Sequence, residues 1–310
     1  MRKPVSLLAA LLLAGSTAAP VAAQQPALGS AARPLRVVLI PADGGTEDGT
    51  KADYQPVFNA VSRMTGLNFD LKVAQSYGAV VEAMCNRTAD IAFFGPVTYV
   101  QAHDRGCAQL LAVAVEKGQS IYYAGVFAKA DAHIATLADL KGKRVAFGDL
   151  NSTSSFVFPL AMMMSAHLDP VRDLKAIRLT GSHANSLGAL VQDQVDAAAL
   201  SFDSFDKAVA QGAVNPREIR VVARSGPIPY PPLAMSTKLP DPLKAQLKTA
   251  FGNVAKAPGV TPDMIRGYGG GKVDRYDAAF PEARFRVAAV EMAQVTDQMK
   301  GEILKAAARR

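Results

Sequence analysis

The chain has 310 residues, which is more than one hydrophobic core usually fills, so we expect two lobes. Hydrophobic residues make up 49% and charged residues 20% of it, which is ordinary for a soluble globular protein. The net charge of +7 is scattered without a basic run, and zinc-ligand spacings are absent, so we expect no nucleic-acid partner, no metal and no cofactor.

Residues 1–23 have the pattern of a secretory signal peptide. Arg2 and Lys3 precede an apolar run at residues 7–14, and the segment ends in small residues before Gln24. The apolar run is too short to cross a membrane as a stable helix. The sequence therefore predicts a protein that is exported to the periplasm and cleaved near Ala23.

Strand and helix patterns alternate through the first part of the mature chain. Strand patterns lie at residues 35–40, 69–73, 91–94 and 110–115, with helix patterns at 54–64, from 77 and from 96. This alternation predicts an α/β lobe with a mainly parallel sheet. The glycine-rich loop at residues 41–50 lacks the nucleotide-binding spacings, so it does not indicate a nucleotide site.

The same alternation resumes after residue 125. Strand patterns lie at residues 143–147, 175–179, 197–200 and 219–224, and the tail from Pro240 has helical patterns. We therefore expect residues 24–124 plus 226–310 to form lobe 1 and residues 125–225 to form lobe 2, with crossings near Ala124 and Ser225. Ligands of such sheets bind beyond the carboxyl ends of the strands, which places a cleft between the lobes.

Four consecutive hydroxyl residues lie where a strand pattern gives way to a helix pattern, namely Ser152, Thr153, Ser154 and Ser155. The first turn of a helix has backbone N–H groups without intrahelical partners and lies at the positive end of the helix dipole. An oxyanion can be held there without a cationic side chain. The alternative is that one hydroxyl is an N-cap and the others are loop residues.

Further polar or aromatic side chains follow other predicted strands. Tyr77 follows the second strand of lobe 1, and Tyr122 lies near the first crossing. His183 and Asp203 follow two strands of lobe 2. Each alone is more often a core or surface residue, but their common placement at strand ends indicates a shared site.

The two cysteines of this chain, which we expect to be exported, are candidates for a disulfide. Cys85 lies near the end of one predicted helix and Cys107 just after the next, and both helices flank the strand at residues 91–94. We predict a Cys85–Cys107 disulfide, with free thiols as the alternative. A role for Cys107 as a metalloid ligand is disfavoured because it lies away from the strand carboxyl ends.

In its motifs the chain resembles the periplasmic solute-binding proteins that bind phosphate, phosphite and phosphonates for ABC importers. The motifs lie at residues 76–84, 90–99, 137–148, 151–156, 181–183, 195–198 and 225–229. The resemblance covers nearly the whole mature chain. It implies the two-lobed type II periplasmic binding protein fold, a small oxyanion ligand, a monomer, and delivery to an ABC permease in the inner membrane.

The resemblance also assigns ligand-binding residues. By motif, the oxyanion is held by Tyr77, Tyr122, Ser152, Thr153, Ser154 and His183. Asp203 stands where some members hold the amino group of an aminoalkyl phosphonate. The chain departs from those members at residues 230–232, where they tend to have a second carboxylate. This departure favours phosphite, phosphate or methylphosphonate.

Two other functions remain open. The closed protein could signal to a membrane sensor kinase, because relatives include sensors of arsenite. It could also be a hydrolase with Ser154, His183 and Asp203 as nucleophile, base and orienting acid. Ser154 lacks the Gly-x-Ser-x-Gly surroundings of a nucleophile elbow, so binding is favoured over catalysis.

Overall fold

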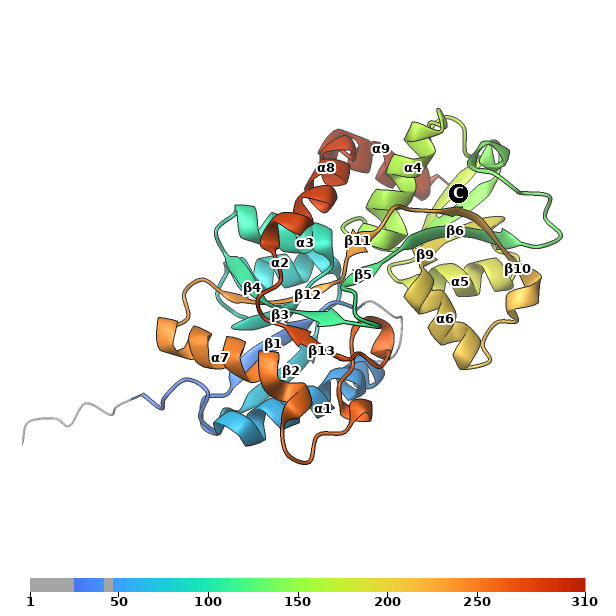
Figure 1. Cartoon of the computed structure of the whole chain (residues 1–310). Helices are drawn as coiled ribbons and strands as arrows, with labels where there is room; N and C mark the ends of the chain where they lie inside the picture. The colour runs from blue at the N-terminus through green and yellow to red at the C-terminus, as the bar shows by residue number, and fades with distance from the viewer. Residues whose placement is uncertain (1–24, 42–46, 310) are drawn as a thin grey trace, which may run out of the picture.

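The computed structural model describes residues 25–41 and 47–309, which fold into two lobes joined by two short strands (Figure 1). Each lobe has its own β-sheet with helices on its faces. The predicted signal peptide lies outside the described residues. Part of the glycine-rich loop, residues 42–46, lies outside them as well.

Lobe 1 contains a six-stranded sheet in the order β13-β4-β12-β3-β1-β2. Its strands are β1 (Leu35–Leu39), β2 (Phe69–Val73), β3 (Ile91–Phe93), β4 (Ala108–Val115), β12 (Pro232–Ser236) and β13 (Arg275–Asp277). The helices of this lobe are α1 (Glu47–Thr65), α2 (Tyr77–Cys85), α3 (Pro96–Asp104) and α7 (Asp241–Asn253). β3 is buried along its whole length, as expected for a central strand covered on both faces.

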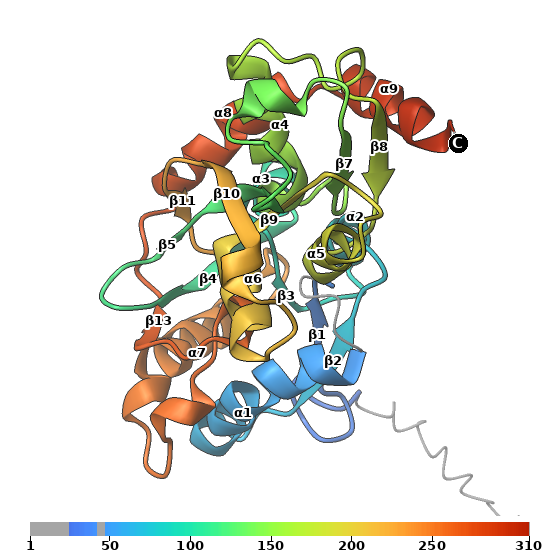
Figure 2. The same cartoon turned by 90° about the vertical axis from the view of Figure 1, so that its right-hand side faces the viewer.

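Lobe 2 contains a five-stranded sheet in the order β10-β6-β9-β7-β8. Its strands are β6 (Ala124–Lys129), β7 (Arg144–Phe147), β8 (Ala176–Leu179), β9 (Ala197–Ser201) and β10 (Ile219–Arg224). The helical segments are η1 (Leu137–Leu140), η2 (Thr153–Val157), α4 (Phe158–Ser165), α5 (His183–Val191), α6 (Phe202–Ala210) and η3 (Pro216–Glu218). Figure 2 shows α5 and α6 facing α1 of lobe 1.

The two sheets share a core of five strands with the same topology. Apart from the edge strand β13 of lobe 1, the order β2-β1-β3-β12-β4 corresponds to β8-β7-β9-β6-β10, with β12 and β6 inserted at the same place. The inserted strand, β12 in lobe 1 and β6 in lobe 2, comes from the segment that has just crossed between the lobes, and it is antiparallel to both neighbours. Both sheets are therefore mixed. The predicted α/β fold class with mainly parallel strands is confirmed, because four strands of each sheet share one direction.

The hinge consists of β5 (Ile121–Tyr122) and β11 (Ile228–Pro229), which pair antiparallel between the lobes. The first crossing is held to the second by the backbone N–H of Ala124, which donates to the Ser225 hydroxyl at 3.0 Å. Because both crossings lie side by side, a small change in their backbone angles can rotate one lobe relative to the other.

The tail differs from the expected run of helices. After α7 come three short turns, η4 (Val254–Lys256), η5 (Pro262–Met264) and η6 (Tyr268–Gly270), and then strand β13. The chain then forms η7 (Glu282–Phe285), α8 (Arg286–Gln294) and α9 (Asp297–Ala308). We expected all of residues 226–310 in lobe 1, but α9 packs against β8 of lobe 2, and the Ile303 side chain of α9 is completely buried. The lobes are thus also connected by the C-terminal helices.

Cys85 and Cys107 are bonded to each other in the structure, with their Cα atoms 4.9 Å apart. Cys85 is the last residue of α2, and Cys107 directly precedes β4. The disulfide therefore joins the carboxyl ends of α2 and α3, opposite to their N-terminal residues Tyr77 and Pro96. Within the described ranges, no helix is both long and apolar enough for a membrane crossing.

Candidate functional site

The hydroxyl residues form the first turn of a buried helix in lobe 2. Ser152 caps it, because its side chain accepts a hydrogen bond from the backbone N–H of Ser155 at 3.2 Å. The turn itself is a π-helix, η2, which continues directly into α4. Such wide turns are frequent at functional sites. All four hydroxyl residues, Ser152 to Ser155, are at most 2% exposed.

The four hydroxyls point in different directions. Those of Thr153 and Ser154 bond with the Tyr122 hydroxyl from the hinge. The Ser155 Oγ is buried, has no hydrogen-bond partner among the described residues, and lies against Gly148. A Cβ on Gly148 would come within 2.1 Å of that oxygen, so only glycine fits there. Two of the four hydroxyls thus face the junction between the lobes, and the capping interpretation holds for Ser152.

The loop before this helix contacts the helix N-termini of lobe 1. The Val97 N–H in the first turn of α3 donates to the Thr153 Oγ1 at 2.9 Å. The Tyr77 N–H, at the start of α2, donates to the Asp149 carboxylate at 3.2 Å. Residues 149–153 of lobe 2 therefore lie at the N-termini of two helices of lobe 1.

Five helices begin at this junction. A helix follows the carboxyl end of β2 and β3 in lobe 1 and of β7, β8 and β9 in lobe 2, and contacts between residues 77–97 and 149–153 bring these two edges together. Tyr77 is the first residue of α2, His183 is the first residue of α5, and Ser201 caps α6. The starts of α3 and of η2 complete the set. Because each N-terminus carries a partial positive charge, the junction favours an anion.

His183 is completely buried, and its hydrogen bonds determine its tautomer. Its Nδ1 accepts from the Ser201 backbone N–H at 3.0 Å, so the neutral ring carries its proton on Nε2. That Nε2 lies 2.8 Å from the Tyr268 hydroxyl and 3.4 Å from the Tyr77 hydroxyl. Burial lowers the pKa of His183 to about 3. His183 is therefore a neutral donor near pH 7.

This depressed pKa predicts a loss of stability in mild acid. The unfolded chain binds a proton at His183 near its ordinary pKa of about 6.5, whereas the folded chain does not until about pH 3. The full stability is present above about pH 6.5 and is lost as the pH falls toward 3, by up to about 1.4 kcal/mol per pH unit. Urea unfolding of wild type and His183→Gln between pH 4 and 8 measures this. Parallel pH profiles for the two proteins would contradict it.

Tyr122 and Asp203 mark the edge of a cleft beside the junction. Burial raises the pKa of Tyr122 above its ordinary value, so the phenol keeps its proton and can donate a hydrogen bond. Asp203, in the first turn of α6, lines a cleft of about 820 Å³ together with Tyr122 and Tyr268. Asp203 thus lies on the cleft side of the Tyr122 ring, while Tyr77, Thr153, Ser154 and His183 do not line the cleft.

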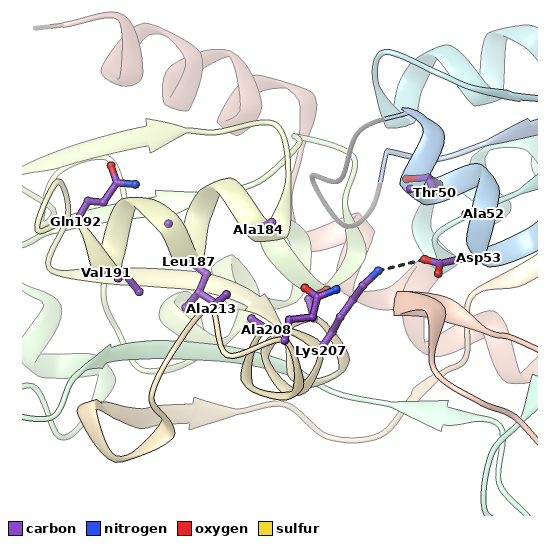
Figure 3. Close-up of a pocket in the computed structure, with 14 residues that line it drawn as sticks. Thr50, Ala52, Asp53, Ala184, Leu187, Val191, Gln192, Lys207, Ala208 and Ala213 are labelled. Carbon is purple, nitrogen blue, oxygen red and sulfur yellow. Dashed lines mark hydrogen bonds and ion pairs between the residues drawn. The ribbon is translucent and has the colours of Figure 1, made fainter. Parts of the chain in front are cut away.

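A second cavity of about 530 Å³ lies between α1 of lobe 1 and the helices α5 and α6 of lobe 2. Figure 3 shows Lys207 reaching across it to Asp53, with 3.1 Å between the Nζ and a carboxylate oxygen. Both side chains are about three-quarters buried. This ion pair joins α1 of lobe 1 to α6 of lobe 2.

Sequence reasoning missed two residues of the junction, Asp149 and Tyr268. Asp149 stands directly beside the predicted hydroxyl cluster, and burial raises the pKa of its carboxyl group. Tyr268 comes from the tail. The sequence feature that could have pointed to it is the run of glycines around it, at residues 267–271. In the described parts of the chain, no three His, Cys, Asp or Glu side chains are grouped to hold a metal ion.

The arrangement of Ser154 and His183 does not form a nucleophile and base. Ser154 bonds with Tyr122, whereas His183 bonds with Ser201, Tyr268 and Tyr77. A hydrolase would need the serine hydroxyl within hydrogen-bond reach of the imidazole. The geometry instead gathers hydroxyl and N–H groups at the junction between the lobes.

The chain is similar to known proteins over most of its length. The family described as "ABC transporter, phosphonate, periplasmic substrate-binding protein" matches residues 44–279. The Phosphate-import protein PhnD of Mycolicibacterium smegmatis is 30% identical over 236 residues, which are 70% of this chain and 70% of that protein. The Phosphonates-binding periplasmic protein of Escherichia coli is 27% identical over 218 residues, which are 69% and 64% of the two chains.

Solved structures show the same fold. PhnD1 of Prochlorococcus marinus, in complex with methylphosphonate, superposes with a TM-score of 0.72 at 15% identity, covering 84% of this chain and 97% of that one. The family match spans most of the sequence and includes both lobes and the junction. Its members are binding proteins and not enzymes. This chain therefore belongs to the family of periplasmic substrate-binding proteins of phosphonate ABC transporters.

Proposed function

We propose that this protein captures a phosphorus oxyanion, namely phosphite, phosphate or a small phosphonate, and delivers it to an ABC permease in the inner membrane. The observation that carries the proposal is the convergence of five helix N-termini and several hydroxyl groups at the junction between the lobes. We also propose that the mature protein begins after Ala23 and acts as a monomer.

In this proposal the anion is held by groups from both lobes and the hinge. Thr153 and Ser154 supply hydroxyls and the first N–H groups of η2, and Tyr122 supplies a protonated phenol. His183 supplies its Nε2–H, and Tyr77 a second phenol at the same nitrogen. Ser152 contributes by capping the turn. A tetrahedral oxyanion has three or four oxygens, each able to accept more than one hydrogen bond, which matches this number of donors.

Binding by both lobes explains why a ligand would close them. A ligand shifts a hinge only if it has more favourable contacts in the closed state than in the open state. Tyr77 belongs to lobe 1, Tyr122 to the hinge, and Thr153 to lobe 2, so all three reach one anion only when the lobes meet. The Asp53–Lys207 ion pair joins the two lobes, so separating them would break it.

The donor chemistry supports a ligand that can carry a proton. Hydroxyl groups donate to a dianion and also accept from the P–OH group of a monoanion. Sulfate has no proton to give near neutral pH. The relatives point the same way, since one is described as a phosphate importer and another as binding phosphonates.

Isothermal titration calorimetry with a ligand panel tests the proposal. The panel contains phosphite, phosphate, methylphosphonate and 2-aminoethylphosphonate, with sulfate as the control for negative charge alone. We expect saturable 1:1 binding of at least one of the smaller phosphorus oxyanions, at least about tenfold tighter than sulfate, a difference of about 1.4 kcal/mol. Binding of sulfate as tightly as every phosphorus ligand, or no binding of any phosphorus oxyanion, would contradict the proposal.

A further inference from the structure

A glycine-rich segment of the tail enters the junction between the lobes. This segment, which we call the glycine arm, comprises residues 267–271 with the sequence Gly-Tyr-Gly-Gly-Gly. It packs between α1 of lobe 1 and α6 of lobe 2. Gly270 has a φ of +68°, and a Cβ there would lie 2.4 Å from the Asp53 carboxylate. Only glycine allows the arm to pass this close to α1.

The arm delivers one aromatic side chain, Tyr268, to the anion site. Tyr268 is 3% exposed, and its hydroxyl lies 2.8 Å from the Nε2 of His183. The Ser201 hydroxyl lies 3.4 Å from the same oxygen. The backbone carbonyl of Tyr268 accepts from the Tyr230 hydroxyl at 3.2 Å, so the residue is held at both its main chain and its side chain.

Tyr268 and Tyr122 together separate the anion site from the neighbouring cleft. Their rings meet edge to face with centroids 5.6 Å apart. Both line the 820 Å³ cleft, and each also bonds to a residue of the junction, Tyr122 to Ser154 and Tyr268 to His183. The two rings therefore form a wall with the anion site on one side and the cleft on the other.

We propose that Tyr268 is a specificity-determining residue, which limits the substituent on phosphorus by closing the side of the site that faces the cleft. This inference rests on the proposed function. A phosphorus atom held by Thr153 and Ser154 has its oxygens directed at the donors, so a substituent must leave on another side. The cleft offers the space for a large substituent, and the Tyr268 ring stands in front of it.

The ring and the hydroxyl of Tyr268 are expected to affect ligand binding in different ways. The ring excludes large substituents, whereas the hydroxyl orients the imidazole of His183 through the Nε2 contact. Removing only the hydroxyl should weaken all ligands alike, because every ligand would meet a less fixed histidine. Removing the ring should change the preference between small and large ligands.

Calorimetry with methylphosphonate and phenylphosphonate distinguishes the two consequences. We expect wild type to prefer methylphosphonate by about 100-fold or more, because a filled pocket rejects added bulk. Tyr268→Ala should reduce this ratio by about tenfold or more. Tyr268→Phe should keep the ratio and lower both affinities by about threefold to tenfold, as expected for one hydrogen bond. Tyr99→Phe is the matched control, since this buried tyrosine bonds to Glu282 away from the junction and should change neither affinity.

A ratio that stays within about twofold of the wild-type value in Tyr268→Ala would overturn the inference while leaving the proposed function intact. Failure of wild type to bind methylphosphonate or phenylphosphonate would overturn the inference. The proposed function would fall with it only if phosphite, phosphate and 2-aminoethylphosphonate were not bound either. If thermal unfolding shows that Tyr268→Ala does not fold, Tyr268→Leu replaces it, because leucine keeps apolar volume but lacks the flat ring. The same reduction of the ratio is then required.

Discussion

Replacing Thr153 with valine is expected to weaken methylphosphonate binding about 100-fold. Valine keeps the shape of the side chain but removes the hydroxyl, which bonds with Tyr122 and accepts the Val97 N–H from lobe 1. The variant loses a proposed donor to the anion, and the buried Val97 N–H loses its acceptor when the lobes meet. Hydrogen bonds to charged groups contribute about 1.5–3 kcal/mol each, which corresponds to about 10- to 100-fold in affinity.

A matched threonine provides the control. Thr98 is as buried as Thr153, but its hydroxyl bonds to the backbone carbonyl of Gly95 within its own lobe. Thr98→Val should leave the affinity within about threefold, since its hydroxyl donates to a neutral backbone carbonyl instead of to the anion, and such a bond contributes about 1 kcal/mol to the protein's stability. If Thr153→Val and Thr98→Val lowered the ligand affinity equally, the effect at Thr153 would come from disturbed packing and not from a lost contact with the anion.

Removing the Cys85–Cys107 disulfide is expected to lower the free energy of unfolding by about 3 kcal/mol without changing ligand affinity. The bond closes a loop of 22 residues, and closing a loop of this length restricts the unfolded chain by about that amount. It joins the carboxyl ends of α2 and α3, whereas the proposed site uses their N-termini. The melting temperature should fall by several degrees, roughly 2–4 °C per kcal/mol in a protein of this size.

The double variant Cys85→Ala and Cys107→Ala measures this by thermal unfolding, with calorimetry on the same sample for ligand affinity. Wild type treated with dithiothreitol should melt at the same lowered temperature as the variant. An unchanged melting temperature under both conditions would show that the disulfide contributes nothing to stability. A large loss of affinity at unchanged stability would instead place the bond in the binding mechanism.

Most individual elements could be predicted from local sequence patterns. The strand at residues 69–73 and the helix starts at Tyr77 and Pro96 agree with the structure, because apolar spacing, caps and proline act over a few residues. The insertion of β12 and β6 into the sheets could not be predicted in this way. Their pairing depends on which strand edges are left open after the chain crosses the hinge.

The hydroxyl cluster was predictable as a group but not residue by residue. Its position after a strand and before a helix is a local feature of the sequence. Which hydroxyl points where depends on the π-turn, which directs Thr153 and Ser154 to Tyr122 and directs Ser155 to Gly148. The role of Tyr268 could not be predicted from local sequence patterns, because it lies 85 residues after His183, the histidine that it contacts.

A crystal structure of the complex with the tightest ligand of the panel tests the central claim most directly. The account predicts the phosphorus group between the lobes, with oxygens within about 3.2 Å of the hydroxyls of Thr153, Ser154 and Tyr122, the ordinary range of hydrogen bonds. A phosphorus group bound elsewhere, with these three hydroxyls still bonded only to one another and to Val97, would contradict it.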